Sequence, residues 1–340
     1  MKLIELSERG RIPDKVMRVG MRRLIARRLR DERARASGSR ELFLTGLKGA
    51  PIAVSPRTAN EQHYEMPAKF FEMHLGPRLQ YSCGLYKHAK DTIARAERNM
   101  VALCTEQAGL ADGQRILDLG CGWGAFTLWA AERFPKSEVV ALSNSAHQKT
   151  LIEKRAGAAG LENVRVVTAN FSDFDFKEPP GFDRIVCIEL FEHLRNWGAA
   201  LAKVRRWLKP DGRMFLDVFA HKELAYLFDS EGDDNWMGRH FFTGGMMPSY
   251  DLVESFADDL KVEKKWWLDG THYQRTATEW LARLDERRRA ILPILERVHG
   301  EVEAPMRFQR WRMFYLALAE TFGYRKGTEW GVAQYLLAPK

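Results

Sequence analysis

The sequence has few cysteines and no long apolar run. Its 340 residues contain four cysteines, none spaced like a metal ligand: Cys83, Cys104, Cys121 and Cys187. A chain of this length needs no disulfides to hold its core, so we expect a reduced, cytoplasmic protein. No apolar stretch approaches the roughly 18 residues that a membrane span requires. The first residues also lack the apolar segment of a secretory signal, and no metal is expected.

The excess of positive charge lies at one end of the chain. Residues 1–40 contain thirteen Lys and Arg against five Asp and Glu, which accounts for the whole net charge of +8. Residues 41–340 are therefore neutral overall. A basic protein can indicate a nucleic-acid partner, but here the bias belongs to one terminal segment.

This basic segment predicts an amphipathic helix over residues 14–35. Its apolar side chains recur at helical spacing: Met17, Met21, Leu24 and Ile25. The sequence ASGSR around Ser37 predicts the end of the helix, with loosely structured residues over 42–57. Such a helix can pack on the body with a solvated basic face, or it can contact a membrane surface or another anionic partner.

From residue 115 onward, short apolar runs alternate with helical stretches. The expected strands cover residues 115–119, 138–142, 164–168, 184–188 and 213–219. Helices are expected over 123–133, 146–158 and 198–208, and Pro210-Asp211-Gly212 predicts a turn. A further strand is expected over 261–268, followed by helical stretches over 276–300 and 304–322. This alternation predicts an α/β fold with a doubly wound, parallel sheet.

A glycine-rich loop follows the first expected strand: Asp118-Leu119-Gly120-Cys121-Gly122-Trp123-Gly124. A chain that turns from strand into helix beneath a nucleotide needs residues without side chains, because its backbone must approach the ligand closely. The pattern G-x-G-x-G alone is weak, but Asp118, the strand and the helix are all in register here. The alternative is a tight turn that binds nothing.

The loop also favours one class of nucleotide. Dinucleotide-binding folds use G-x-G-x-x-G with a helix N-terminus facing a pyrophosphate, whereas this loop has G-x-G-x-G and an acidic residue at the strand end. S-adenosylmethionine has no phosphate, but its ammonium and sulfonium groups suit an acidic site with apolar walls. The loop therefore predicts S-adenosylmethionine as the ligand.

Several motifs occur in a fixed order along the chain: His63-Tyr64-Glu65, Phe70-Phe71, Leu75-Gly76, Tyr81-Ser82-Cys83, the loop ILDLGCGWG and Glu189-Leu190-Phe191-Glu192-His193. Together they resemble the cyclopropane fatty acid synthase superfamily of methyltransferases. Further motifs are residues 241–249 (FFTGGMMPS), His272-Tyr273, Phe322-Gly323-Tyr324 and Glu329-Trp330. With these, the chain is similar to the branch of coclaurine and pavine N-methyltransferases within the superfamily. The resemblance covers essentially the whole chain.

This resemblance implies a Rossmann-like class I methyltransferase with a mostly parallel, seven-stranded sheet. The last strand, at about 331–337, would insert antiparallel. Residues 1–60 would form a basic helical segment and residues 61–340 the methyltransferase core, with helical cap insertions at about 221–258 and 276–322. A homodimer is also an expectation from the resemblance alone.

The resemblance further implies which residues contact S-adenosylmethionine: Tyr81, Ser82, Asp118, Gly120, Gly122, Asn144, Gln148, Asn170 and Phe171. Asn144 and Gln148 would lie near the ribose, where many methyltransferases place an acidic residue instead. Asn170 and Phe171 would lie near the adenine.

One position departs from the cyclopropane synthases. Those enzymes hold a bicarbonate base with Cys, Glu, His and Tyr side chains at positions that resemble Cys83, Glu192, Asp217 and Tyr273. Asp217 stands where the histidine is expected, and a carboxylate beside Glu192 would repel bicarbonate. An amine acceptor is therefore favoured over a lipid acyl chain.

Methyl transfer to an amine requires a neutral nucleophile and stabilisation of the cation that forms. Glu189, Glu192 and His193 follow the fourth expected strand, at the edge where open α/β sheets bind ligands. We expect Glu192, His193 and Glu189 to be the catalytic residues, with Glu192 and His193 orienting or deprotonating the amine. Glu192 could instead be a carboxylate that favours the start of a helix, and His193 could bridge the core and the cap. Glu189 could contact the methionine moiety of the cofactor or have a structural role. Asp217 would add negative potential or simply cap a strand end.

The expected cap is rich in aromatic residues, which at helical spacing usually belong to a core. Four residues of the matching motifs are expected to line the substrate pocket: Phe242, Met246, Tyr273 and Trp330. Cys83 and Asp217 are also expected to contact the substrate. Aromatic faces suit an amine that becomes a cation, and methionine gives an adaptable apolar wall. Trp280 and Trp311 are interpreted as packing residues.

The leading hypothesis is N-methylation of a small aromatic amine of the tetrahydroisoquinoline or arylalkylamine type. The alternative is a cyclopropane synthase-like lipid methyltransferase, which the basic N-terminal helix favours through weak membrane-surface contact. Enzymes that methylate nucleic-acid bases carry an Asn/Asp-Pro-Pro-Tyr/Phe motif after the fourth strand. This chain has two carboxylates there, so a nucleic-acid substrate is not expected. A non-catalytic S-adenosylmethionine sensor is not expected either, because it would not need Glu192, His193 and Tyr273 together.

Overall fold

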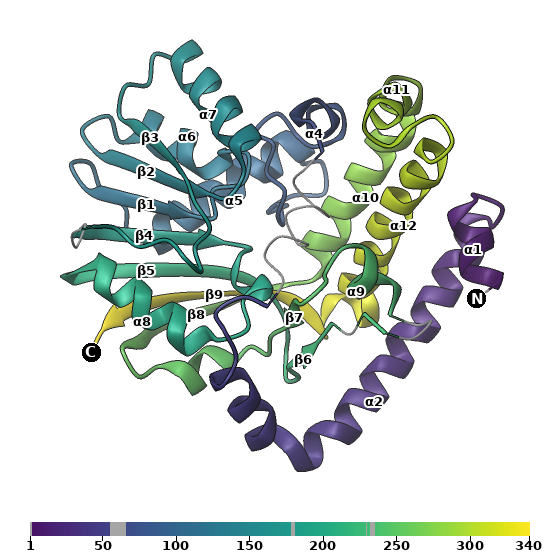
Figure 1. Ribbon diagram of the computed structural model, residues 1–340, viewed down its shortest axis with the longest axis horizontal. Helices are drawn as coiled ribbons and strands as arrows, with labels where there is room; N and C mark the ends of the chain where they lie inside the picture. The colour runs from purple at the N-terminus through teal and green to yellow at the C-terminus, as the bar shows by residue number, and fades with distance from the viewer. Residues whose placement is uncertain (1, 55–65, 178–180, 229, 232–234) are drawn as a thin grey trace.

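In the computed structural model, the chain folds around one twisted sheet, and a layer of helices lies beyond the ends of its strands on one side (Figure 1). The structure describes residues 2–54, 66–177, 181–228, 230–231 and 235–340. The predicted motif at His63, Tyr64 and Glu65 lies outside the described residues.

The main sheet has seven strands in the order β3-β2-β1-β4-β5-β9-β8. Their bounds are β1 Arg115–Leu119, β2 Glu138–Ser143, β3 Val164–Thr168, β4 Phe182–Ile188, β5 Leu208–His221, β8 Leu260–Asp269 and β9 Trp330–Pro339. The first five in that order are parallel, and β9 pairs antiparallel with both β5 and β8. The predicted doubly wound sheet with an inserted antiparallel strand is confirmed. Two short strands, β6 Tyr226–Leu227 and β7 Met246–Met247, form a separate antiparallel pair.

The central strands are apolar on both faces because each face has its own core. Ile116 packs into the cluster shared with the helical layer, whereas its neighbour Leu117 packs into the cluster on the opposite face. Both are fully buried. Successive side chains of a strand point to opposite faces, so a strand covered on both sides needs a nearly continuous apolar run. This is why these strands could be predicted.

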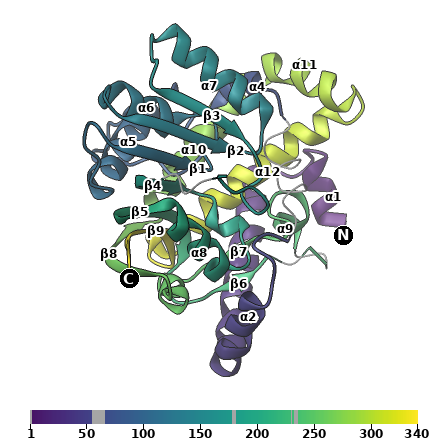
Figure 2. The same ribbon diagram turned by 60° about the vertical axis from the view of Figure 1, so that its left-hand side comes forward.

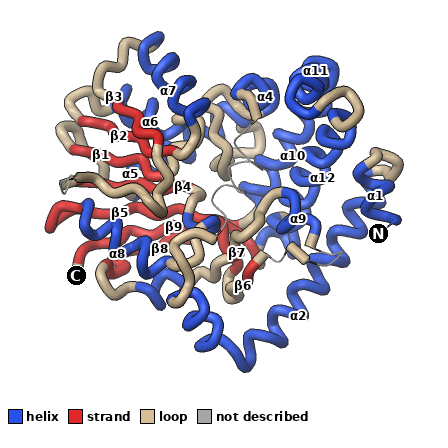
Figure 3. The backbone as a smooth tube through the Cα atoms, viewed as in Figure 1, coloured by secondary structure: helices blue, strands red, loops and turns tan. Residues whose placement is uncertain are grey.

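Helices flank the sheet and build the layer beyond it (Figure 3). Those beside the sheet are α5 Ile93–Gln107, α6 Ala125–Arg133, α7 Ala146–Ala158 and α8 Trp197–Trp207. The layer contains α1 Lys2–Glu8, α2 Asp14–Lys48, α4 Ala68–His74, α9 Trp236–His240, α10 Thr271–Glu286, α11 Arg288–His299 and α12 Ala304–Phe322. Short 3₁₀ segments cover Phe191–His193, Leu252–Phe256 and Tyr324–Gly327.

Helix α2 does not end near Ser37, so the predicted end is wrong, and so is the loose structure expected over residues 42–48. The helix continues to Lys48, and Figure 1 shows it changing direction in its C-terminal third. Glycine and serine bend a helix without necessarily ending it. Beyond the bend, Leu47 is buried with 2% of its surface exposed, and Asn196 donates to the carbonyl of Lys48 at 2.8 Å. These tertiary contacts outweigh the weak local propensity.

Two other boundaries differ from the sequence prediction. The stretch expected as one helix over 276–300 is two helices that meet at Arg287, and the first begins earlier, at Thr271. The predicted turn at Pro210-Asp211-Gly212 lies within β5, which starts at Leu208. There the register with β4 jumps from Phe182–Leu208 to Arg184–Arg213. The turn residues therefore form an irregularity in the strand rather than a loop before it.

Helix α2 runs along the outside of the helical layer (Figure 1), and it projects beyond the rest of the molecule at the bottom of Figure 2. It is tied to α12 by Glu320, which is 4% exposed and pairs with Arg18 at 2.6 Å and also with Arg22. Of the helices in the described ranges, none combines the length and the apolar character needed to cross a membrane.

Candidate active site

The glycine-rich loop turns directly from β1 into α6. Gly120 has a φ of 80° and Gly122 a φ of 51°, in the left-handed region that residues with side chains avoid. A Cβ atom on Gly120 would also lie 3.1 Å from the side chain of Leu190. The loop therefore needs glycine at Gly120 both for its conformation and for its close approach to the segment after β4.

Asp118, at the end of β1, is a buried carboxyl group. It is 2% exposed and accepts a hydrogen bond from the Thr127 hydroxyl at 2.5 Å. Burial raises the pKa of Asp118 to about 7, against a lowering by the Thr127 hydrogen bond. A cation that approached this carboxyl group would favour its ionised form.

Two cavities lie on either side of the loop, at the carboxyl ends of the central strands. The loop cavity includes Tyr81, Ser82, Asp118, Gly120, Gly122 and Trp123 in its wall. The strand-end cavity includes Gly120, Gly122, Ser143, Asn144, Gln148, Asn170, Phe171 and Ser172. All nine residues predicted to contact a nucleotide thus line one of these two cavities. They flank the point between β1 and β4 where the strand order reverses, which is where open α/β sheets bind ligands.

Polar groups in these walls lack partners within the protein. The amide oxygen of Gln148 accepts from Ser143 at 2.5 Å, but its Nε2 has no partner although it is buried. Ser172 Oγ in the strand-end cavity is likewise unpartnered, as are Gln80 Oε1 and Trp123 Nε1 in the loop cavity. Buried polar groups are costly unless they are hydrogen-bonded, so these atoms indicate a polar ligand.

A third cavity, here called the carboxylate cavity, adjoins both of the others. Tyr81, Glu189, Glu192, His193 and Tyr273 line it together with apolar side chains. Glu189 lines all three cavities, Tyr81 is shared with the loop cavity and His193 with the strand-end cavity. The predicted acid–base residues therefore stand where the three cavities meet.

Glu189 is held in an unusual backbone conformation at this junction. Its φ is 53°, and its N–H donates to the carbonyl of Asp217 at 2.9 Å. A residue with a side chain in this region costs on the order of 1–3 kcal/mol, and such strain collects at functional sites. The carboxyl accepts from the Tyr273 hydroxyl at 3.3 Å through Oε2, whereas its Oε1 is buried without a partner.

The electrostatics of this group follow from burial and from like charges. Glu192 is 2% exposed, and burial with the nearby Asp217 carboxyl raises its pKa to about 8. The pKa of Glu189 rises well above its ordinary value through burial, Glu192 and Asp217. His193 lies 4.0 Å from Glu192 and stacks on Phe242 at 5.6 Å, and burial lowers its pKa to about 4. At neutral pH the imidazole is therefore uncharged.

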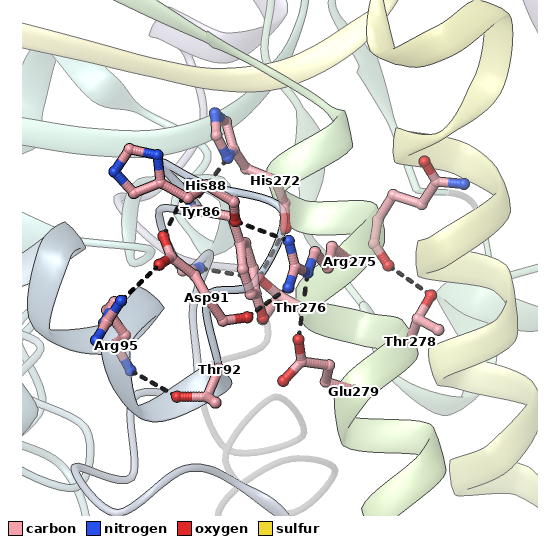
Figure 4. Close-up of polar contacts among 12 residues, drawn as sticks. Tyr86, His88, Asp91, Thr92, Arg95, His272, Arg275, Thr276, Thr278 and Glu279 are labelled. Carbon is pink, nitrogen blue, oxygen red and sulfur yellow. Dashed lines mark hydrogen bonds and ion pairs between the residues drawn. The ribbon is translucent and has the colours of Figure 1, made fainter.

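The segment that carries Tyr81, Ser82 and Cys83 is fastened to α10, which carries Tyr273 (Figure 4). The N–H of Gly84 donates to Thr276 Oγ1 at 3.0 Å, and the N–H of Tyr86 donates to His272 Nδ1 at 3.2 Å. Arg275 lies 4.1 Å over the ring of Tyr86 and donates to backbone carbonyls of residues 88 and 91. These contacts fix the loop cavity relative to the carboxylate cavity.

The residues predicted to bind the substrate fall into two groups. Phe242 and Tyr273 line the carboxylate cavity, and Trp330 lines a larger apolar chamber next to it. Cys83, Asp217 and Met246 are buried and are not among the residues that line either space. Asp217 lies behind the wall, where it accepts from Gln334 Nε2 at 2.6 Å and its pKa is raised by burial to about 7.

Several wall residues were missed by the sequence reasoning. Trp280 lines the carboxylate cavity although it was interpreted as packing, and so do Phe219, Phe314 and Leu318. Trp280 lies two helical turns from Tyr273, a spacing that could have placed both on one face. The apolar chamber is lined by Met17, Met21 and other residues of α1 and α2, and it shares Phe219, Phe242 and Leu318 with the carboxylate cavity.

The comparisons with known proteins agree with this geometry. Residues 54–325 match the family model described as mycolic acid cyclopropane synthetase. The chain belongs to this family. An (S)-coclaurine N-methyltransferase of Thalictrum flavum subsp. glaucum is 35% identical over 100% of this chain and 96% of its own length. The cyclopropane-fatty-acyl-phospholipid synthase of Escherichia coli K12 is 29% identical over 94% of this chain and 76% of its own.

One solved structure matches almost completely. The crystal structure of coclaurine N-methyltransferase bound to N-methylheliamine and S-adenosylhomocysteine has a TM-score of 0.95 and 35% identity, and the match covers 99% of both chains. The protein is an S-adenosylmethionine-dependent methyltransferase, as the sequence predicted.

The residues present fit this cofactor. The loop without side chains, the buried carboxyl of Asp118 and the unpartnered amide of Gln148 supply the close approach, the negative charge and the donor that it requires. The part that each of these residues plays in cofactor binding stays a prediction. Among the residues that the structure describes, no group of three or more His, Cys, Asp or Glu has the arrangement of a metal site.

Proposed function

We propose that the protein transfers a methyl group to the nitrogen of a small aromatic amine of the tetrahydroisoquinoline or arylalkylamine type. The main support is the position of the carboxyl pair of Glu189 and Glu192, with the neutral His193 beside it. The pair stands where the loop cavity and the strand-end cavity meet the carboxylate cavity, whose wall is partly aromatic. The names of its relatives, coclaurine and pavine N-methyltransferase, support an amine acceptor.

The chain's own groups can prepare such an amine. An amine enters mostly as an ammonium ion, and its charge favours ionisation of a carboxyl in the pair. The ionised carboxyl then takes the proton that must leave before nitrogen can attack. When bound, S-adenosylmethionine would supply the activated methyl group. The positive charge that then appears on nitrogen is stabilised by the carboxyl pair and by the aromatic faces of Phe242 and Tyr273.

The apolar chamber fits the remainder of such a molecule. Its wall combines α1 and α2 with Phe219, Trp236 and Phe322, and it adjoins the carboxylate cavity through Phe242. A flat aromatic amine would place its nitrogen beside Glu192 and its rings against this chamber. In this arrangement the apolar side chains of helix α2 would line the substrate site, while most of its basic side chains face outward.

The alternative is methylation or cyclopropanation of a lipid acyl chain, which the Escherichia coli relative represents. The chamber is apolar enough for an acyl chain, but the acidic group at its end suits a cation better than an uncharged double bond. Asp217 behind the wall adds to that negative potential.

Mass spectrometry of the products would decide between the two acceptors. Purified protein is incubated with S-adenosylmethionine and either a panel of tetrahydroisoquinolines and arylalkylamines or vesicles of unsaturated phospholipid. One added methyl group on an amine, with inert vesicles, supports the proposal. A methylene added to the lipid chains, with inert amines, overturns it.

Three further proposals concern the surroundings of the protein. Its four cysteines are free and buried, which supports a reducing, cytoplasmic location. Exposed Val16, Val19, Arg23 and Arg30 on α2 suit weak contact with an anionic membrane surface. Flotation with anionic and neutral vesicles tests that contact, and light scattering tests the homodimer expected from the resemblance.

A further inference from the structure

Glu97, on α5, holds the turn that leads into the loop cavity, which residues 79–82 line. The residue is 1% exposed, and its Oε2 accepts from the N–H of Arg78 at 2.9 Å while its Oε1 accepts from the N–H of Gln80 at 3.2 Å. A Cβ atom on Gly76 would lie 2.4 Å from the same carboxyl group, so the backbone fits closely around it. Each carboxyl oxygen therefore serves one backbone N–H of this turn.

The same turn contains Leu79, whose φ of 57° lies in the left-handed region that residues with side chains rarely adopt. Its N–H donates to the carbonyl of Gly76 at 3.0 Å. In addition, Arg155 of α7 donates to the carbonyl of Pro77 at 2.8 Å. Contacts with two helices thus hold the strained turn and fix the direction in which the next residue, Gln80, leaves it.

The side-chain amide of Gln80 has only one orientation that satisfies its neighbour. Gln80 is 5% exposed, and its Nε2 donates to the carbonyl of Cys83 at 2.5 Å. A backbone carbonyl can only accept, so the amide nitrogen must be on that side and the oxygen on the other. Gln80 Oε1 is buried without a partner among the described residues, and Gln80 lines the loop cavity. Such an acceptor is costly unless a ligand completes it.

The loop cavity offers acceptors that suit a cation. Besides Gln80, its wall contains the buried carboxyl group of Asp118. Adenine and ribose are expected in the strand-end cavity, which leaves the loop cavity for the amino-acid end of S-adenosylmethionine. The ammonium group at that end has three N–H donors and no acceptor, so it matches an unpartnered amide oxygen.

We propose that the amide oxygen of Gln80 accepts a hydrogen bond from the ammonium group of S-adenosylmethionine, and that Glu97 is the positioning residue that holds Gln80 for this contact. Gln80 is not among the nine residues that the sequence predicts for the cofactor. The inference rests on the S-adenosylmethionine-dependent activity and does not depend on which acceptor is methylated. S-adenosylhomocysteine keeps the ammonium group, so the contact forms with it as well.

Calorimetric binding to the full chain tests the contact with two ligands: S-adenosylhomocysteine and its deaminated analogue, in which hydrogen replaces the ammonium group. Gln80→Met keeps the length of the side chain but removes the amide. We expect this variant to bind S-adenosylhomocysteine roughly ten- to a hundredfold more weakly than the wild type does. The deaminated analogue should bind both proteins equally well. Equal weakening of the two ligands, or no weakening of either, overturns the proposal.

Gln107→Met is the matched control for this change. It removes another amide whose oxygen is buried without a partner among the described residues, and Gln107 lines none of the cavities described here. Both affinities should stay at their wild-type values. A loss of S-adenosylhomocysteine affinity as large as that in Gln80→Met would refute a specific contact at Gln80.

Glu97→Gln tests the positioning role. Glutamine has one oxygen and one NH₂ group where two backbone N–H groups need acceptors, so the N–H of Arg78 or of Gln80 meets another donor. We expect weaker binding of S-adenosylhomocysteine and unchanged binding of the deaminated analogue. The double variant of Glu97→Gln and Gln80→Met should bind no more weakly than Gln80→Met alone, because both changes remove the same contact. Additive losses, or weaker binding of the deaminated analogue, refute this role of Glu97.

Asp91→Asn is the control for Glu97→Gln. Asp91 is a buried carboxyl group that accepts from two backbone N–H groups in the next turn of the chain, at 2.8 and 3.0 Å (Figure 4). Its replacement should leave the ratio of the two affinities unchanged, and a change as large as that in Glu97→Gln would overturn the assignment. A failure of amine methylation would leave all of these binding results intact.

Discussion

Glu189 and Glu192 line the same buried cavity, and the Glu192 carboxyl raises the pKa of Glu189. Two ionised carboxylates so close in a buried site would repel each other. The pair can therefore gain a negative charge only as the pH rises, or when a cation arrives beside it. This one relationship governs the first three predictions below.

Glu192→Gln should remove the base and leave the cofactor site intact. We expect turnover of the amine to fall by about 10²- to 10⁴-fold. In the wild-type enzyme kcat/KM should rise with pH through the pKa of Glu192, at about 8, and this rise should vanish in the variant. Steady-state rates across the neutral to alkaline range measure both effects.

Glu254→Gln, at an exposed carboxylate paired with Lys265, is the control. A collapse of S-adenosylhomocysteine affinity in Glu192→Gln would instead assign Glu192 to the cofactor.

The same carboxyl should make folding stability depend on pH. Its pKa is raised in the folded protein from an ordinary 4.5 to about 8. Between those values the unfolded chain releases the proton while the folded protein keeps it, so this group's contribution to stability is lost as the pH rises. Glu192→Gln cannot ionise, so its melting temperature should gain on that of the wild type across this window. A constant difference would show that Glu192 titrates normally.

Asp217→Asn should act on the carboxyl pair from behind the wall. The Asp217 carboxyl raises the pKa of Glu192, and asparagine keeps an acceptor for Gln334 without the charge. We expect the alkaline rise in kcat/KM to move to lower pH, and Asp217→His to weaken amine methylation. Kinetics identical to the wild type in both variants would remove Asp217 from the site.

Gln148→Ala should weaken cofactor binding through the loss of one buried donor. Its Nε2 lies in the strand-end cavity without a protein partner. We expect S-adenosylhomocysteine to bind about tenfold more weakly, in line with roughly 1–2 kcal/mol for such a hydrogen bond. Gln309→Ala removes another buried amide nitrogen without a partner, outside the cavities, and should not change the affinity. Equal effects of the two changes would argue against a ligand contact at Gln148.

Glu320→Ala should loosen α2 from α12. The glutamate is buried and pairs with Arg18 and Arg22, although Arg22 is 60% exposed. We expect a loss of roughly 1–3 kcal/mol in the local stability of this contact. The KM of the amine should rise because α2 walls the apolar chamber, with S-adenosylhomocysteine affinity unchanged. Limited proteolysis of α2 reports the loosening, and an unaltered KM would exclude α2 from the substrate site.

The sheet could be predicted because burial on both faces leaves a direct mark on the sequence. The five parallel strands are each found within a few residues of their expected bounds, apart from the early start of β5 at Leu208. The true end of α2 is not visible locally, because the contacts of Leu47 and Asn196 that extend it come from distant parts of the chain. The break at Arg287 between α10 and α11 was likewise missed, since nothing in the local pattern interrupts the apolar spacing.

Likewise, one part of the candidate site could be predicted from the sequence and the other could not. Seven of the nine residues predicted for the cofactor lie at or just after the ends of β1, β2 and β3, and parallel strands place their ends side by side, so these seven come together. Tyr81 and Ser82 lie before the first strand, and only the resemblance to the family pointed to them. The acceptor side depends on which way side chains of the cap turn. Met246 belongs to a short strand and turns into the core, whereas Phe242 faces the carboxylate cavity. Such choices depend on packing between elements and leave no periodic signal.

Strand β9 also constrains the order in which the molecule can form. Residues Trp330–Pro339 fill the position between β5 and β8, so the sheet stays split until this late segment has been synthesised. A growing chain on the ribosome would meanwhile expose two unpaired strand edges, which are prone to wrong association. The enzyme should thus complete its core only after translation has passed residue 339, and loss of this one strand should prevent folding altogether.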